Sequence, residues 1–152
     1  MKWYLLHPMA VHFPIALLTT GFLAEAAGTW FKKQNSNQDA APRLPWLQDA
    51  ASWLLWLGTL SALVTLGLGL LAAKTAPHVP EAWDTLIAHR NAGYIACFLF
   101  SLLSAWRFFS RPKAGLFLAA WLLLGLSALI YAAYHGGELV YRYGMGTAPS
   151  AE

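Results

Sequence analysis

The sequence predicts an all-α integral membrane protein, a single four-span domain arranged as an up-down-up-down four-helix bundle. Two observations support this prediction. Of 152 residues, 58% are hydrophobic and only 11% are charged, whereas a soluble domain carries about 25% charged residues. Four apolar stretches are also long enough for a bilayer core, which a helix of about 20 residues crosses. Membrane lipid is therefore the expected surrounding, and no basic patch indicates nucleic-acid binding.

Each predicted span is bounded by helix-start or helix-end residues. Proline suits a first helical turn, where its missing N–H would be unpaired anyway. Gly136 and Gly137 follow the last span and predict its end, because glycine accepts the left-handed turn that closes a helix. The predicted spans are 9–31, 46–73, 83–109 and 114–135, and the prolines at or just before their starts are Pro8, Pro45, Pro80 and Pro112.

Basic residues between the spans predict the orientation. Six lie on the side opposite the N-terminus (Lys32, Lys33, Arg43, Arg107, Arg111 and Lys113), and four lie on the N-terminal side (Lys2, Lys74, Arg90 and Arg142). Loops rich in Lys and Arg stay in the cytoplasm. The count predicts a multi-pass protein of the bacterial inner (cytoplasmic) membrane with both termini on the periplasmic side.

All five histidines fall on the N-terminal side of this predicted bundle. They are His7, His12, His78, His89 and His135. His12 and His89 lie in the first turns of spans 1 and 3, and His135 ends span 4, so the three are expected at similar depth. Ionisable residues inside membrane spans mark functional sites by default.

Neutral imidazoles at one depth indicate a cofactor or metal site. A b-type haem takes one axial ligand from each face, commonly histidines on two helices of a bundle. His12 and His89 are the expected axial pair, and His135 is a substitute for either. Arg90 and Arg142 are expected counter-ions for the haem propionates.

Two alternatives to haem remain. Copper or zinc accepts imidazole ligands alone, and His7, His12, His89 and His135 are then the expected metal ligands. The second alternative is that the protein is a cofactor-free accessory subunit of a larger respiratory or photosynthetic complex. The sequence contains no GxSxG, HExxH or Walker pattern. No catalytic residue is assigned, and an electron carrier or complex subunit is favoured over a stand-alone enzyme.

Span 1 carries two further polar or helix-breaking features. Pro14 frees the Ala10 carbonyl and predicts a kink, which either directs His12 inward or is an ordinary tolerated proline. Glu25 lies about 140° around the helix from His12, so it is not expected to share the histidine site. It is expected to reach the interface or to hydrogen-bond another helix.

The sequence also shows a weak internal repeat. His12 precedes Trp30, and His89 precedes Trp106, by nearly the same interval of about five helical turns. This weak repeat indicates either a duplicated helical hairpin or coincidence.

The chain begins with His7-Pro8-Met9-Ala10-Val11-His12-Phe13-Pro14-Ile15-Ala16-Leu17 and closes with Gly136-Gly137-Glu138-Leu139-Val140-Tyr141. Both segments resemble a bacterial membrane-protein family known as domain of unknown function 2231. The resemblance covers essentially the whole chain, although Tyr143 stands where that family often has a histidine. Some members are joined to redox modules such as Rieske domains. The resemblance therefore implies electron transfer, between quinol and a periplasmic c-type cytochrome or a Rieske-type partner.

Overall fold

The computed structural model describes residues 3–34, 45–110 and 116–145, and no strand occurs among them. These residues form five α-helices and two short 3₁₀ helices. In chain order they are η1 (Trp3–Leu5), α1 (Leu6–Ala10), α2 (His12–Gln34), α3 (Pro45–Thr75), η3 (Pro80–Ala82), α4 (Trp83–Ser110) and α5 (Leu116–Tyr141).

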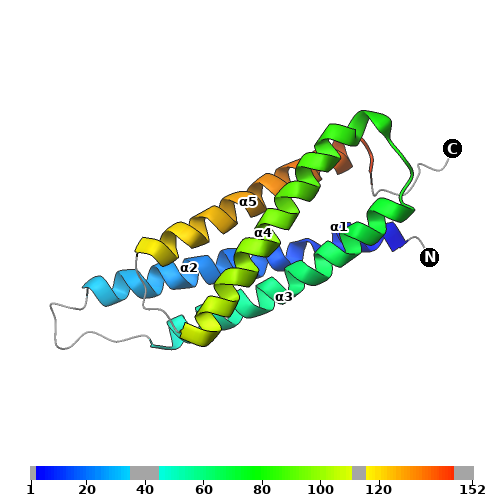
Figure 1. The fold of residues 1–152 in the computed structure, drawn as a ribbon. Coiled ribbons are helices and arrows are strands. Elements are labelled where there is room, and N and C mark those ends of the chain that lie inside the picture. Colours follow the sequence, from blue (N-terminus) through cyan, green and yellow to red (C-terminus); the bar gives the residue numbers. More distant parts are fainter. Residues whose placement is uncertain (1–2, 35–44, 111–115, 146–152) are drawn as a thin grey trace.

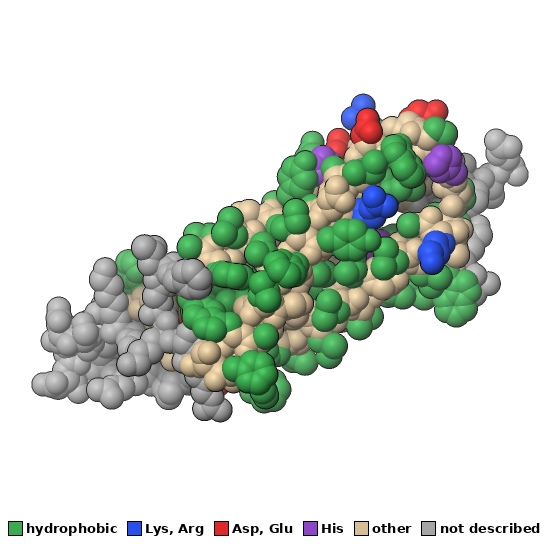
Figure 2. All heavy atoms as spheres, viewed as in Figure 1, with side chains coloured by type: hydrophobic (Ala, Val, Ile, Leu, Met, Phe, Trp, Pro, Cys, Tyr) green, Lys and Arg blue, Asp and Glu red, His purple; other side chains and the backbone are tan. Residues whose placement is uncertain are grey.

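Four helical segments are long and apolar enough to cross a membrane: Trp3–Phe31, Trp46–Thr75, Pro80–Ser110 and Leu118–Tyr141. The all-α class and the four spans predicted from the sequence are confirmed. Apolar side chains cover the flank of the molecule, whereas charged and histidine side chains gather where α4 begins and α5 ends (Figure 2).

The helices pair as two hairpins. Successive long helices alternate in direction, so α1 begins and α5 ends at the same end of the molecule (Figure 1). Helix α2 packs along α3, helix α4 packs along α5, and α3 meets α4 less extensively. The described residues 3–34 and 45–75 are called the first hairpin below, and residues 80–110 and 116–141 are called the second hairpin.

Close-packed side chains hold the helices of each hairpin together at mid-depth, and one buried apolar cluster includes residues of both hairpins. Lipid tails are as apolar as leucine, so packing and small residues, rather than water exclusion, bring membrane helices together. Gly58 lets Leu18 approach the α3 backbone, and Gly125 does the same for Phe100 on α5. The buried apolar cluster consists of Leu18, Leu55, Phe100, Leu103, Leu118 and Leu122.

The first span is interrupted at Val11, between α1 and α2. Pro14 has no N–H to offer the carbonyl of Ala10. The hydroxyl of Thr65 on α3 donates to that carbonyl instead, at 3.4 Å. A neighbouring helix thus satisfies the freed backbone group, as membrane interiors require. Helix α1, which carries His7, packs against α3.

Helix α5 runs past its predicted end. Gly136 and Gly137 lie inside the helix, which continues to Tyr141. The residue in the left-handed region is Gly144, with φ of 65°. Gly136 serves close approach instead, because a Cβ there would lie 3.1 Å from Cε1 of His89. The starts predicted at Pro112 and Ala114 lie outside the described residues.

Candidate functional site

His7 reaches from α1 onto helix α3. Its Nδ1 donates to the carbonyl of Thr65 at 3.0 Å. The ring lies against Gly69, where a Cβ would stand 2.9 Å from Cε1. Because a carbonyl oxygen only accepts, Nδ1 carries the proton and Nε2 of the neutral ring keeps a lone pair.

His89 has the same surroundings in the second hairpin. Its Nδ1 donates to the carbonyl of Ala132 on α5 at 2.8 Å. Its ring lies against Gly136, one helical turn further along α5. Nε2 of His89 is again the nitrogen that keeps the lone pair.

His7 and His89 meet at the boundary between the hairpins. Their ring centroids are 5.9 Å apart and the rings are inclined at 76°. Each imidazole is thus oriented by a backbone carbonyl of its own hairpin. Histidines that bind metals are commonly held this way, with one ring nitrogen bonded to a carbonyl or carboxylate and the other free to ligate.

His135 adds a third oriented imidazole. Its Nδ1 lies 2.9 Å from Oε2 of Glu138, and its ring packs edge-on against Tyr131 and Tyr134. Nε2 of His135 is buried and has no hydrogen-bond partner among the described residues. Arg142 lies 3.7 Å from the other oxygen of Glu138 and is largely exposed. A polar chain therefore connects His135 to the surface.

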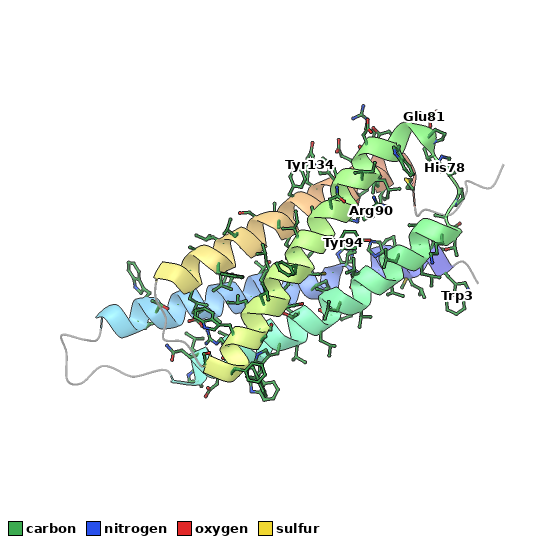
Figure 3. All side chains as sticks on the ribbon, viewed as in Figure 1. Trp3, His78, Glu81, Arg90, Tyr94 and Tyr134 are labelled. Carbon is green, nitrogen blue, oxygen red and sulfur yellow. The ribbon has the colours of Figure 1, made fainter. Side chains whose placement is uncertain are left out.

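The structure does not bring His12 into this cluster. Its side chain is exposed on α2, and the imidazole that meets His89 is that of His7, so the role of His12 stays a prediction. His12 follows His7 by about one and a half helical turns, so the two imidazoles lie on different faces of the first span. Arg90 and Tyr94 are also exposed, and Figure 3 shows both at the end of α4 that carries His89.

A second buried polar group lies toward the other end of the molecule. Nη1 of Arg107 stands 2.9 Å from Oε2 of Glu25, and both side chains are about nine-tenths buried. Arg107 also donates to the hydroxyl of Ser52 at 3.0 Å and to the carbonyl of Gln48 at 3.4 Å. A cavity of about 10 Å³ beside the pair has room for about one water. The sequence predicts that Glu25 stays apart from the histidines, but it does not identify Arg107 as the partner.

No three His, Cys, Asp or Glu side chains within the described ranges are placed to hold a metal ion together. A zinc site takes three or four protein ligands. The donor set at this end of the molecule therefore consists of the His7–His89 pair, with His135 nearby.

Comparisons with known proteins identify the family. No curated protein and no solved structure matches the chain. A family model described as predicted membrane protein (DUF2231) matches residues 5–149. This match covers both hairpins and all five histidines. The chain is therefore a member of the DUF2231 family of membrane proteins.

Proposed function

We propose that this protein is a membrane electron carrier that holds one b-type haem between His7 and His89. The observation that carries the proposal is the matched pair of imidazoles on two different hairpins. Each donates Nδ1–H to a helix carbonyl and keeps the lone pair of Nε2. Two protein ligands suffice for haem iron, whereas a bare zinc ion needs three or more.

His7 and His89 would be the residues that hold the iron. Imidazole nitrogens bind metals at about 2.0 Å, so two imidazoles that shared one metal ion would have to lie close together. The observed separation of the ring centroids is 5.9 Å.

When bound, the haem supplies one-electron redox chemistry. The protein's own residues orient the ligands and balance charge. Thr65 and Ala132 hold the two imidazoles through their carbonyls. Arg90 and Arg142 lie at the same end of the molecule as counter-ions for anionic propionates. The closing polar chain from His135 through Glu138 reaches the surface at this end.

The proposed setting is the bacterial inner membrane with the histidine end facing the periplasm. The basic residues of the loops support this orientation. A haem held by His7 and His89 near that face would supply electron transfer between quinol and a periplasmic c-type cytochrome or a Rieske-type partner.

Visible spectroscopy tests the proposal. The protein is purified in mild detergent from a host that makes haem, and oxidised and dithionite-reduced spectra are recorded with a pyridine haemochrome assay. A sharp α-band on reduction and about one haem per chain are expected. A featureless spectrum from folded protein would refute the haem proposal and favour a cofactor-free accessory subunit. Metal analysis of the same sample tests for copper or zinc.

A further inference from the structure

The two histidine environments repeat in detail. In each hairpin a histidine donates to a carbonyl of the next long helix and lies against a glycine one helical turn beyond that carbonyl. In the first hairpin the acceptor is Thr65 and the glycine is Gly69. In the second hairpin the acceptor is Ala132 and the glycine is Gly136.

The same sequence intervals recur at mid-depth. Leu18 lies against Gly58, and Phe100 lies against Gly125. The interval from Leu18 to Phe100 equals the interval from His7 to His89. The interval from Gly58 to Gly125 equals the interval from Gly69 to Gly136. Both Leu18 and Phe100 are 2% exposed, although one is aliphatic and the other aromatic, so the packing is repeated where the amino-acid identity is not.

Glu25 and Arg107 are separated along the sequence by the same number of residues as His7 and His89. Glu25 and Arg107 form an ion pair with each other. His7 and His89 likewise meet each other. Equivalent positions of two copies meet only where a two-fold axis passes between them. In each hairpin about five helical turns, or about 27 Å, separate the histidine from the charged residue. One helix face therefore carries both contacts.

We infer that the chain contains two copies of one helical hairpin related by a pseudo-two-fold axis, and that Glu25 and Arg107 are positioning residues for His7 and His89. The ion pair fixes the register between the hairpins at one end of the axis, and the imidazoles meet at the other end. This inference does not depend on which cofactor, if any, the imidazoles bind.

The contacts of Glu25 and Arg107 are suited to fixing the register between the two hairpins. Arg107 is a residue of the second hairpin that contacts both long helices of the first, through Glu25 on α2 and through Ser52 and Gln48 on α3. Removing one partner of a buried pair leaves an uncompensated charge, which is strongly unfavourable. A shifted register would separate the two charges in the same way, so the paired register is favoured over its neighbours.

The first test measures association between the hairpins. A protease site is inserted after Pro77, between α3 and η3, and the purified full-length protein is cleaved in detergent. The dissociation constant of the two halves is then measured. We expect R107E to weaken association by about 100-fold or more and E25Q to weaken it less. The charge swap E25R/R107E should recover at least about tenfold of the loss. The exposed Asp49 on α3 provides the matched control D49N, which should leave association unchanged.

The second test measures register in the uncleaved chain. The substitutions H7C and H89C are introduced in a C97A background, and a short bifunctional thiol reagent joins the two positions. The cross-linking rate should fall in R107E and return in E25R/R107E. Because both imidazoles are absent, this result is independent of haem binding.

Three outcomes would overturn the inference. R107E could hold the halves as tightly as the wild type. The swap could associate no better than R107E. Cross-linking could proceed at the same rate in all variants, which would leave the pair a stabilising contact without a positioning role. If R107E does not accumulate in the membrane, E25Q and the swap decide the first test.

Discussion

Replacing Gly69 by alanine tests how the histidine pair is held. A Cβ at this position would stand 2.9 Å from Cε1 and 3.1 Å from Nδ1 of His7. The ring cannot turn away without losing its hydrogen bond to Thr65. Overpacking costs about 1–3 kcal/mol, and a lost hydrogen bond adds about 0.5–1.5 kcal/mol.

Gly67 supplies a matched control on the same helix, because a Cβ there would meet no heavy atom within 4 Å. Both substitutions gain about 1 kcal/mol of helix propensity, which cancels in the comparison. G69A should therefore unfold at lower denaturant than G67A, with a difference in unfolding free energy of about 1.5–4.5 kcal/mol.

The assay is reversible unfolding in mixed micelles of SDS and a mild detergent, followed by tryptophan fluorescence. If G69A and G67A agree within about 0.5 kcal/mol, which is the size of an ordinary surface effect, the close packing of His7 against α3 is refuted.

Three further substitutions probe the same framework. G125A would bring a Cβ to 3.0 Å from Cζ of the buried Phe100, so mixed-micelle unfolding should show a loss of about 1–3 kcal/mol; unchanged stability would contradict this packing. T65V removes the hydroxyl donor to the Ala10 carbonyl and should cost about 0.5–1 kcal/mol in the same assay, whereas no loss would mean that the carbonyl needs no such partner. E138A removes the acceptor that holds Nδ1 of His135, so nitrogen NMR should change from a single Nδ1–H tautomer to a mixture; an unchanged spectrum would show that Glu138 does not set the tautomer.

The fold could be predicted from the sequence because the length and apolar composition of a segment are enough to predict a membrane span. A run of about 20 apolar residues has no other stable solution in lipid than a helix. Helix ends depend on tertiary contacts as well. Gly136 and Gly137 predicted a helix end because glycine favours it, but Gly136 instead makes room for His89. Whether a glycine ends a helix or admits a neighbouring ring depends on tertiary contacts that one chain segment does not reveal.

The histidine site could be predicted only in outline. The sequence predicts that the histidines lie at one end and that His89 belongs to a pair, and in the structure its ring meets that of His7. The sequence favours His12 over His7 because His7 lies just before the predicted first span, which begins at residue 9. Pro14 predicts a freed carbonyl at Ala10, but the hydroxyl that bonds to this carbonyl belongs to Thr65 on another helix.

The spacing of residues along the first span indicates which histidine shares a helix face with Glu25. Glu25 is far around the helix from His12, but it lies about five full turns from His7. The same interval separates His89 from Arg107. The weak repeat that aligns His12 with His89 therefore has the wrong register. The inferred repeat aligns His7 with His89. Arg107 was counted only as a loop charge, because sequence alone does not show that its side chain is buried.

The most direct test of the account is the haem content of single histidine variants. H7A, H89A and H12A are purified alongside the wild type, and haem per chain is measured with the reduced spectrum and low-temperature EPR. The account predicts a low-spin bis-imidazole signal in the wild type, its loss in H7A and H89A, and its retention in H12A. A wild-type protein that binds haem equally well in H7A and H89A, or that loses haem in H12A alone, would contradict the assignment of the site to His7 and His89.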